Sequence, residues 1–324
     1  MRIDKRQFVT GAAALAAAGL TVAPAAGAEG LIKITVGFPP GGAGDLFARM
    51  FAERLREELG RPIVIENNAG AGGLTAAESF RRQPPDGSAL MIHTGSTAIT
   101  APISRKNPPY DPLKDYLWIA LLSVAPFGIA VSPSVPAKDL REFLDYVRSQ
   151  PGKLSYGSAG VASSTHLAAE LFKERAGGLD IVHVPYRGSA AAITDVLTGI
   201  LTFIVDPLST LLPQHRDGKL RILAVMDEAR AKVAPEIPTT KEFGLDVPAG
   251  TCNLLVAPLG TPPSVIEPIA AATAKVCQRP DFQAQLAEFG IEPITGSSPD
   301  KARAFVAGEI ARWTPIVQRL GIAL

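Results

Sequence analysis

Short apolar strands alternate with amphipathic helices along this chain, and that alternation limits the fold more than any other feature of the sequence. Residues 32–38, IKITVGF, alternate apolar and polar side chains as a half-buried strand does. After a proline- and glycine-rich turn, apolar side chains recur at helical spacing: Leu46, Phe47, Met50, Phe51 and Leu55. The stretches PIVIEN, GGLTAAESFRRQ and SALMIHTG continue as strand, helix and strand. This order predicts a parallel sheet with right-handed crossovers.

A second set of strands and helices begins near residue 127. It runs from FGIAVS through LSYGS, IVHVPY and LTFIVD to RILAVM, with helical patterns between most of these strands. Residues 249–257 form one more strand, and three helical segments follow it. Three helices cannot bury themselves beside one strand, so we expect the chain to cross back and complete the first set. We therefore predict an α/β fold of two lobes, each a sheet flanked by helices, joined by a two-strand hinge: residues 29–124 with 250–324, and residues 125–249.

The first 28 residues have the composition of an export signal. Arg2, Lys5 and Arg6 precede an Ala- and Gly-rich apolar run, which closes with the small residues AGA at 26–28. We expect cleavage after Ala28, by the secretory or the twin-arginine route, and a periplasmic location. An uncleaved membrane anchor is the alternative, but the apolar run is short for a bilayer.

Net charge argues against a nucleic-acid partner. The whole chain carries +1, and residues 1–28 hold three basic residues and one acidic residue, so their removal leaves −1. A near-neutral chain with scattered charges is a poor binder of nucleic acid.

Cysteine content and motifs give no sign of a metal or a cofactor. Cys252 lies in an apolar run and Cys277 on a helical pattern, so we favour two buried free thiols, with a disulfide as the alternative. The sequence contains no G-x-S-x-G, H-E-x-x-H, C-x-x-C or phosphate-loop lysine motif. We predict that the protein uses no cofactor and is not an enzyme.

Three turns share one design, in which a strand ends, small residues follow and a helix begins: residues 39–45, 156–167 and 185–191. In a parallel sheet such turns meet at the carboxyl edge of the strands, where helix N-termini present unpaired N–H groups to a ligand. Glycines let the backbone approach a ligand closely, and serine and threonine hydroxyls donate or accept, whereas Arg187 is the one full cation in these turns. The pattern predicts an anion, best a carboxylate, held mainly by uncharged donors. Helix capping and tight turns alone are the structural alternative.

Three ionisable side chains near these turns have both a structural and a functional interpretation. Asp45 is expected to cap its helix rather than to meet the ligand. His166 either faces the cleft or has a structural role. Asp206, at the end of LTFIVD, either accepts a hydrogen bond from a ligand hydroxyl, ammonium or bound water, or shapes a local turn.

Motifs in order along the chain resemble those of one family, the periplasmic solute receptors of tripartite tricarboxylate transporters, often called Bug-type receptors. They are VGFPPGGAGDLFAR, IENNAGAGG, PPDGSALMIHT, YDPLKDY, LSYGSAGVASSTHLAAELFK, VPYRGSAAAITDVLTG, FIVDPLSTLLPQHRDGKLRILAV, IPTTKEFGL, APLGTPP and GEIARWTPIVQRLGI. Each motif alone is weak, but their common order is specific. Two departures leave the particular ligand open: Gly44 replaces a residue that is commonly polar, and TCNLLV replaces a strand that usually holds an aromatic residue.

The resemblance implies a type II periplasmic-binding-protein clamp that closes on a small organic acid: a di- or tricarboxylate, an acidic amino acid, or an aromatic acid such as nicotinate. The turns at 39–45 and 158–166 would grip a carboxylate from opposite lobes. The predicted ligand-binding residues are Phe38, Pro39, Gly41, Gly42, Ala43, Asp45, Ser158, Gly160, Ser163, Ser164, Thr165, His166, Gly188, Ser189 and Asp206.

The function we expect is that of an exported, monomeric receptor that delivers the acid to integral membrane transporter subunits. A ligand-sensing co-receptor for a signalling protein is the alternative with the same cleft. A hydrolase that combines Ser163 or Ser164 with His166 and Asp206 is less favoured, because no nucleophile elbow supports it.

Overall fold

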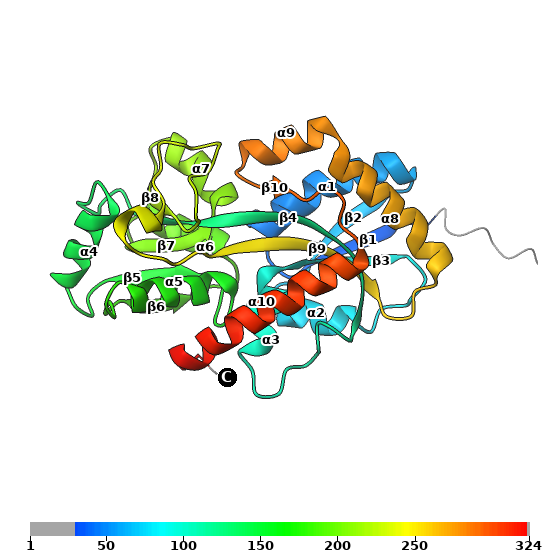
Figure 1. The fold of residues 1–324 in the computed structure, drawn as a ribbon, viewed down its shortest axis with the longest axis horizontal. Coiled ribbons are helices and arrows are strands. Elements are labelled where there is room, and N and C mark those ends of the chain that lie inside the picture. Colours follow the sequence, from blue (N-terminus) through cyan, green and yellow to red (C-terminus); the bar gives the residue numbers. More distant parts are fainter. Residues whose placement is uncertain (1–29, 323–324) are drawn as a thin grey trace, which may run out of the picture.

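The computed structural model describes residues 30–322 as a mixed α/β fold of two lobes (Figure 1). The predicted export signal lies outside the described residues. The strands are β1 (Ile32–Val36), β2 (Ile63–Asn67), β3 (Ala89–Thr94), β4 (Tyr116–Val131), β5 (Ser155–Ser158), β6 (Val182–Pro185), β7 (Phe203–Pro207), β8 (Arg221–Val225), β9 (Gly250–Pro258) and β10 (Glu292–Pro293). The α-helices are α1 (Ala43–Leu59), α2 (Leu74–Phe80), α3 (Ala101–Ile103), α4 (Leu140–Arg148), α5 (Ser164–Arg175), α6 (Ser189–Leu197), α7 (Leu208–Arg216), α8 (Pro263–Gln278), α9 (Pro280–Glu288) and α10 (Pro299–Leu320). Short helical turns are η1 (Ala71–Gly73), η2 (Ser96–Thr100) and η3 (Thr240–Phe243).

The first lobe is built on the parallel strands β2, β1 and β3, in that order, as the strand–helix alternation predicts. Ile32, Ile34 and Val36 of β1 are fully buried, so the period-2 pattern places them in a core. In that core Phe47 and Phe51 of α1 pack against Phe282 of α9. Helices α8 and α9, which follow β9, therefore return to this lobe and cover it.

Two long strands join the lobes across the middle of the molecule (Figure 1). β9 pairs antiparallel with β3 and with residues 116–126 of β4, and residues 127–131 of β4 pair with β7 and β8. The crossing agrees with the predicted two-strand hinge. The sequence pattern located β4 only from Phe127 onward, because the preceding run YLWIALLSVAP is largely buried and shows no clean alternation or turn signal.

The second lobe places β5 between the parallel strands β6 and β7, with β4 antiparallel at the other side of β7. Helices α5, α6 and α7 each follow directly on a strand of this sheet, so their N-termini lie at its carboxyl edge. We propose residues 29–124 with 250–324 and residues 125–249 as the two lobes, and the change of β4 partners near Phe127 supports that division.

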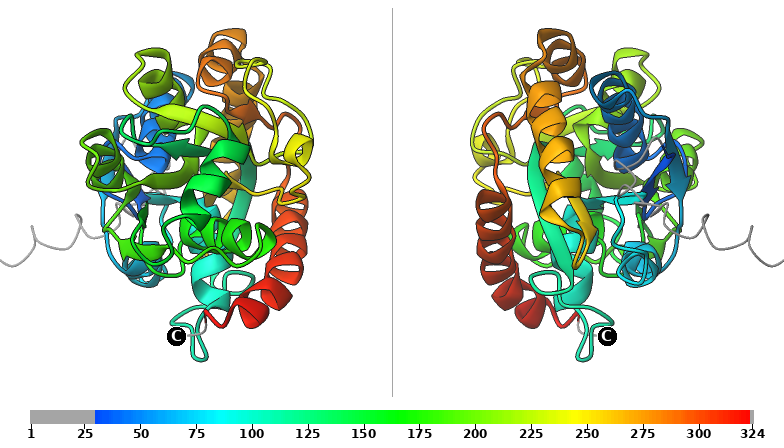
Figure 2. Two further views of the ribbon diagram at one scale, coloured as in Figure 1. Left: turned by 90° about the vertical axis from the view of Figure 1, so that its left-hand side faces the viewer. Right: turned by 90° about the vertical axis from the view of Figure 1, so that its right-hand side faces the viewer.

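The last helix, α10, lies on the outside of the molecule (Figure 2) and runs past both lobes (Figure 1). Trp313 is buried in a core that residues of both sheets share, and Arg319 forms an ion pair with Glu174 of α5, with Nε 2.6 Å from Oε1. Within residues 30–322, no helix is long and apolar enough to cross a bilayer.

Alanine at Gly250 is expected to destabilise the protein by about 1–3 kcal/mol. A Cβ at this position would lie 2.5 Å from the Ala125 carbonyl oxygen on the neighbouring crossing strand, and a backbone atom cannot move aside alone. Urea denaturation measures the change. The matched control is Gly308→Ala in α10, where a Cβ meets nothing within 4 Å; it should gain about 0.5–1 kcal/mol. Equal effects at both sites would contradict the packing argument.

Candidate ligand-binding site

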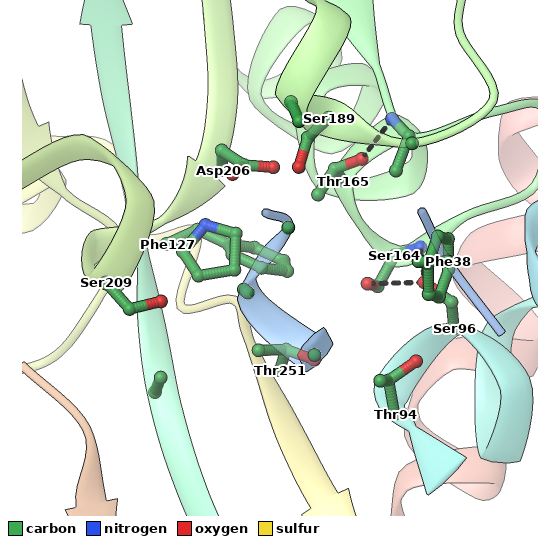
Figure 3. Close-up of a pocket in the computed structure, with 18 of the residues that line it drawn as sticks. Phe38, Thr94, Ser96, Phe127, Ser164, Thr165, Ser189, Asp206, Ser209 and Thr251 are labelled. Atoms are coloured by element: carbon green, nitrogen blue, oxygen red, sulfur yellow. Dashed lines mark hydrogen bonds between the residues drawn. The ribbon is translucent and has the colours of Figure 1, made fainter. Parts of the chain in front are cut away.

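A cavity with about 50 Å³ of room for the centres of water-sized molecules lies between the lobes beside the crossing strands (Figure 3). Both lobes contribute to its wall. The lining residues are Phe38, Pro39, Gly42, Ala43, Gly44, Thr94, Ser96, Ala125, Phe127, Ala159, Ser164, Thr165, Gly188, Ser189, Ala190, Asp206, Pro207, Ser209, Thr251, Asn253 and Ile291.

Four helices begin at this cavity. α1, α5, α6 and α7 follow directly on β1, β5, β6 and β7, and their first turns supply Ala43, Ser164, Ser189 and Ser209 to the wall. The N–H groups of a first helical turn have no partner within the helix, and the helix dipole makes that end partly positive. The cavity is therefore suited to an anion. The sequence predicts the first three helix starts as ligand turns and shows the fourth as a short helical turn.

Asp45 does not line the cavity; its carboxylate holds the first turn by hydrogen bonds. It is 2% exposed, in the first turn of α1, and its Oδ2 accepts hydrogen bonds from the Gly41 N–H (2.9 Å) and Arg49 Nε (2.9 Å), while Oδ1 accepts from Asn67 Nδ2 (2.9 Å). Burial alone would raise the pKa of Asp45, but the hydrogen bonds from Arg49, Gly41 and Asn67 outweigh it and lower the pKa. The helix N-cap is Gly42, so the expected N-cap role of Asp45 is not observed. Instead the carboxylate reaches back to fix the turn.

In the second turn, polar side chains form hydrogen bonds with the backbone of the turn itself. The Ser163 hydroxyl caps α5 by accepting from the His166 N–H (3.3 Å) and donates to the Gly160 carbonyl (2.7 Å). His166 Nδ1 accepts from the Ala162 N–H (3.2 Å), and its ring stacks on His183 with centroids 3.9 Å apart. Burial lowers the pKa of His166 to about 4, so the ring is neutral near pH 7. Its role in the turn is structural.

The two lobes touch around the cavity through small residues. The Ser164 N–H donates to Ser96 Oγ at 3.0 Å, and the two hydroxyls are 2.9 Å apart (Figure 3). Gly188 of the second lobe lies against Pro39 of the first, so that an added Cβ would be 2.6 Å from Pro39 Cδ. The structure is thus a closed arrangement in which both ligand turns meet.

Asp206 has the most unusual environment among the lining residues. It ends β7, is 0% exposed and points toward Ser189 across the upper part of the cavity in Figure 3. Its Oδ2 accepts a hydrogen bond from Thr210 Oγ1 at 2.5 Å, whereas Oδ1 has no hydrogen-bond partner among the described residues. Burial raises the pKa of Asp206 to about 7, and the hydroxyls of Thr210 and Ser189 limit the rise.

No lysine, arginine or histidine appears among the described residues that line the cavity. Two further lining atoms, Thr94 Oγ1 and Ser209 Oγ, are buried without a hydrogen-bond partner within residues 30–322. Unpaired buried polar atoms are uncommon in native proteins, and three of the nine among the described residues, Asp206 Oδ1 included, line this cavity, where a polar molecule would pair with them. An anion at this place would be met by uncharged donors, as the turn composition predicts.

The structure brings most of the predicted site residues together at the cavity: Phe38, Pro39, Gly42, Ala43, Ser164, Thr165, Gly188, Ser189 and Asp206. The other predicted residues do not line the cavity: Gly41, Asp45, Ser158, Gly160, Ser163 and His166. Ser158, for example, pairs its hydroxyl with His183 Nε2 at 2.7 Å. These residues hold the turns in shape.

Several lining residues were not among the predicted ones. Thr94 ends β3 and Ser96 begins η2, and the strand–turn–helix signal that located the other turns could have found them. Phe127, Thr251 and Asn253 come from the crossing strands, and only the fold brings those strands to the cavity.

The two cysteines form no disulfide, and the side chains considered for a hydrolytic triad do not form one. Cys252 and Cys277 are both buried and free, as expected. The Ser163 and His166 side chains are bonded to the backbone of their own turn, and neither is bonded to Asp206. Within the described part of the chain, no group of three or more His, Cys, Asp or Glu residues could hold a metal ion.

Comparison with known proteins agrees with this geometry. BugD, described as a periplasmic binding protein, matches with a TM-score of 0.87 and 28% identity over 90% of this chain and 98% of its own. MatC from Rhodopseudomonas palustris, solved with bound malate, matches with a TM-score of 0.84 and 30% identity over 89% and 98%. Rpa4515 from R. palustris, solved with adipate, matches with a TM-score of 0.87 and 31% identity over 90% and 98%.

The family model described as the tripartite tricarboxylate transporter family receptor matches residues 47–322, most of both lobes. The match includes the four helices that begin at the cavity, apart from the first four residues of α1. The resemblance drawn from the sequence motifs is therefore confirmed, and this chain belongs to the family of tripartite tricarboxylate transporter receptors.

Proposed function

We propose that this protein captures a small organic carboxylate between its two lobes and delivers it to the membrane subunits of a tripartite tricarboxylate transporter. One observation carries the proposal: four helix N-termini and a set of hydroxyls, with no cation among the described lining residues, surround a cavity between the lobes. Similar proteins with bound malate and adipate support the choice of a carboxylate. We also propose that the receptor acts as a monomer and catalyses no reaction.

The affinity that such a site can supply is in the range of a transport receptor. Each helix end contributes about 0.3–1 kcal/mol to binding of an anion, and each hydrogen bond to a charged group about 1.5–3 kcal/mol. After the costs of ordering, four or five contacts leave about −8 kcal/mol, which corresponds to a micromolar Kd. Uncharged donors are therefore sufficient.

Export of the protein is part of the proposal. Family relatives are periplasmic binding proteins, and a receptor that hands its ligand to a membrane transporter must reach the same compartment. We propose that residues 1–28 direct this export and are removed after Ala28.

Isothermal titration of the purified protein against mono-, di- and tricarboxylates tests the function. We expect at least one small carboxylate to bind with micromolar or lower Kd, and sugars of similar size to show no heat. Ser164→Ala should bind the same acid about tenfold more weakly, because it loses a hydroxyl in the wall; Ser149→Ala, on the distant end of α4, is the control. Binding of sugars without binding of any acid would reject the proposed function.

A further inference from the structure

The Asp206 carboxylate leaves one hydrogen-bonding position empty in the cavity wall. The side chain is 0% exposed, Thr210 occupies Oδ2, and Oδ1 has no partner among the described residues. A buried carboxyl oxygen without a partner is costly, because burial removes its water without replacing it. An oxygen of this kind that faces a ligand cavity is best explained by a partner group on the ligand.

The Ser189 hydroxyl faces the Asp206 carboxyl and lowers its pKa, but no side chain among the described residues forms a hydrogen bond with Oδ1. Ser209 comes from α7, Ser189 from α6 and Phe127 from β4, and the described lining residues include no lysine, arginine or histidine. Thr210 is already bonded to Oδ2 and to the Pro207 carbonyl. A molecule in the cavity can supply the hydrogen bond that Oδ1 lacks.

The cavity wall carries hydrogen-bond donors at one place and a carboxyl acceptor, Asp206, at another. The first turn of α1 has no side-chain cap, so its N–H groups can donate to the carboxylate of the ligand, and the partly positive N-terminus of α5 faces the cavity from the other lobe. Asp206 presents the opposite chemistry, an acceptor that bears or shares a negative charge. A second carboxylate placed against it would be repelled, whereas a hydroxyl or an ammonium group would be attracted.

We infer that the ligand is a small acid that carries a hydrogen-bond donor, a hydroxyl or an ammonium group, beside its carboxylate, and that Asp206 Oδ1 accepts a hydrogen bond from that donor. This rests on the proposed function and narrows it to hydroxy acids and amino acids. Asp206 is then the residue that determines specificity, while the helix N-termini bind the carboxylate that all such acids share.

Titration of the wild-type protein with matched acids tests the inference. The panel is butanedioate with its 2-hydroxy and 2-amino derivatives, and propanoate with its 2-hydroxy and 2-amino derivatives, at pH 7.5. In at least one of the two sets, a donor-bearing acid should bind at least tenfold more tightly than the unsubstituted acid. The hydroxy and amino members show which donor the site prefers.

The Asp206→Asn variant should reduce this preference to about twofold or less. Its amide can satisfy Thr210 with the carbonyl oxygen only by turning its NH₂ group toward the ligand donor. Asp217→Asn, at the exposed C-terminal end of α7, removes the same charge away from the cavity and should keep the full preference. Circular dichroism establishes that each variant is folded, and the wild-type panel decides the question without any variant.

The outcomes separate the inference from the function on which it rests. Unsubstituted acids that bind as tightly as their derivatives would overturn the inference and leave the proposed function intact. At pH 7.5, tighter binding of butanedioate than of its 2-hydroxy and 2-amino derivatives would also overturn it, because Asp206 would then act as a proton donor to a second carboxylate. Absence of binding for every acid would overturn both.

Discussion

Replacing Gly188 with alanine is expected to weaken binding of the preferred acid about 5- to 150-fold. An added Cβ would lie 2.6 Å from Pro39 Cδ, which belongs to the other lobe. The proline ring is rigid, so the overlap is relieved only if the lobes move apart. Overpacking of this kind costs about 1–3 kcal/mol, and here the cost falls on the closed state alone, so it subtracts directly from the free energy of ligand binding.

The control for this variant is Gly177→Ala in the same lobe. Both glycines have positive φ, 132° at Gly188 and 98° at Gly177, so alanine strains the backbone at each position, but a Cβ at Gly177 meets nothing within 4 Å. Both variants should therefore lose similar stability in urea denaturation, and only Gly188→Ala should lose affinity. Unchanged affinity in Gly188→Ala would show that the ligand does not require the observed contact between the lobes.

The second large effect concerns stability without ligand. Relative to wild type, Asp206→Asn should gain about 4 kcal/mol in free energy of unfolding between pH 4 and pH 8. In the folded protein burial raises the pKa of Asp206 to about 7, against an ordinary value of 3.8. Between these values the unfolded chain ionises this carboxyl and the folded chain does not, so rising pH favours unfolding of the wild type. Asparagine does not ionise, and its variant escapes this loss.

Urea denaturation of both proteins at several pH values measures the difference. Other buried groups, such as His93, whose pKa burial lowers to about 3, titrate in both proteins and cancel in the comparison. Asp217→Asn should show no such trend with pH. A constant difference between wild type and Asp206→Asn from pH 4 to pH 8 would mean that Asp206 is ionised throughout and has another source of stabilisation. A gain of this size in an unliganded binding protein is the expected consequence of keeping an unpaired carboxyl ready for a ligand.

Local patterns were sufficient to predict the strands and helices around the cavity. Alternation in IKITVGF, small residues after it and helical spacing from Leu46 onward define β1, its turn and α1, and the same signals define β5 with α5 and β6 with α6. They also led to the two lobes, because the final helices needed the sheet of the first lobe to cover, so the chain had to cross back to it. By contrast, the first half of β4 was missed, since a strand buried on both faces lacks the alternation that marks a half-buried one.

The sequence could not distinguish the residues of a turn that line the cavity from those that form hydrogen bonds within the turn. A serine that lines the cavity and a serine that caps a helix satisfy the same pattern: Ser164 faces the cavity, while its neighbour Ser163 bonds to the turn itself. Thr251 and Asn253 were beyond its reach for another reason, because they reach the site through strand pairing between segments more than a hundred residues apart. Side-chain direction and long-range pairing are properties of the packed structure.

Small-angle X-ray scattering of the wild-type protein, with and without a saturating concentration of the acid that binds most tightly, tests the closing of the two lobes on a shared anion. We predict a smaller radius of gyration in the presence of the acid, and little or no decrease in Gly188→Ala at the same fractional occupancy. Identical scattering curves for the free and the saturated wild-type protein would contradict the account.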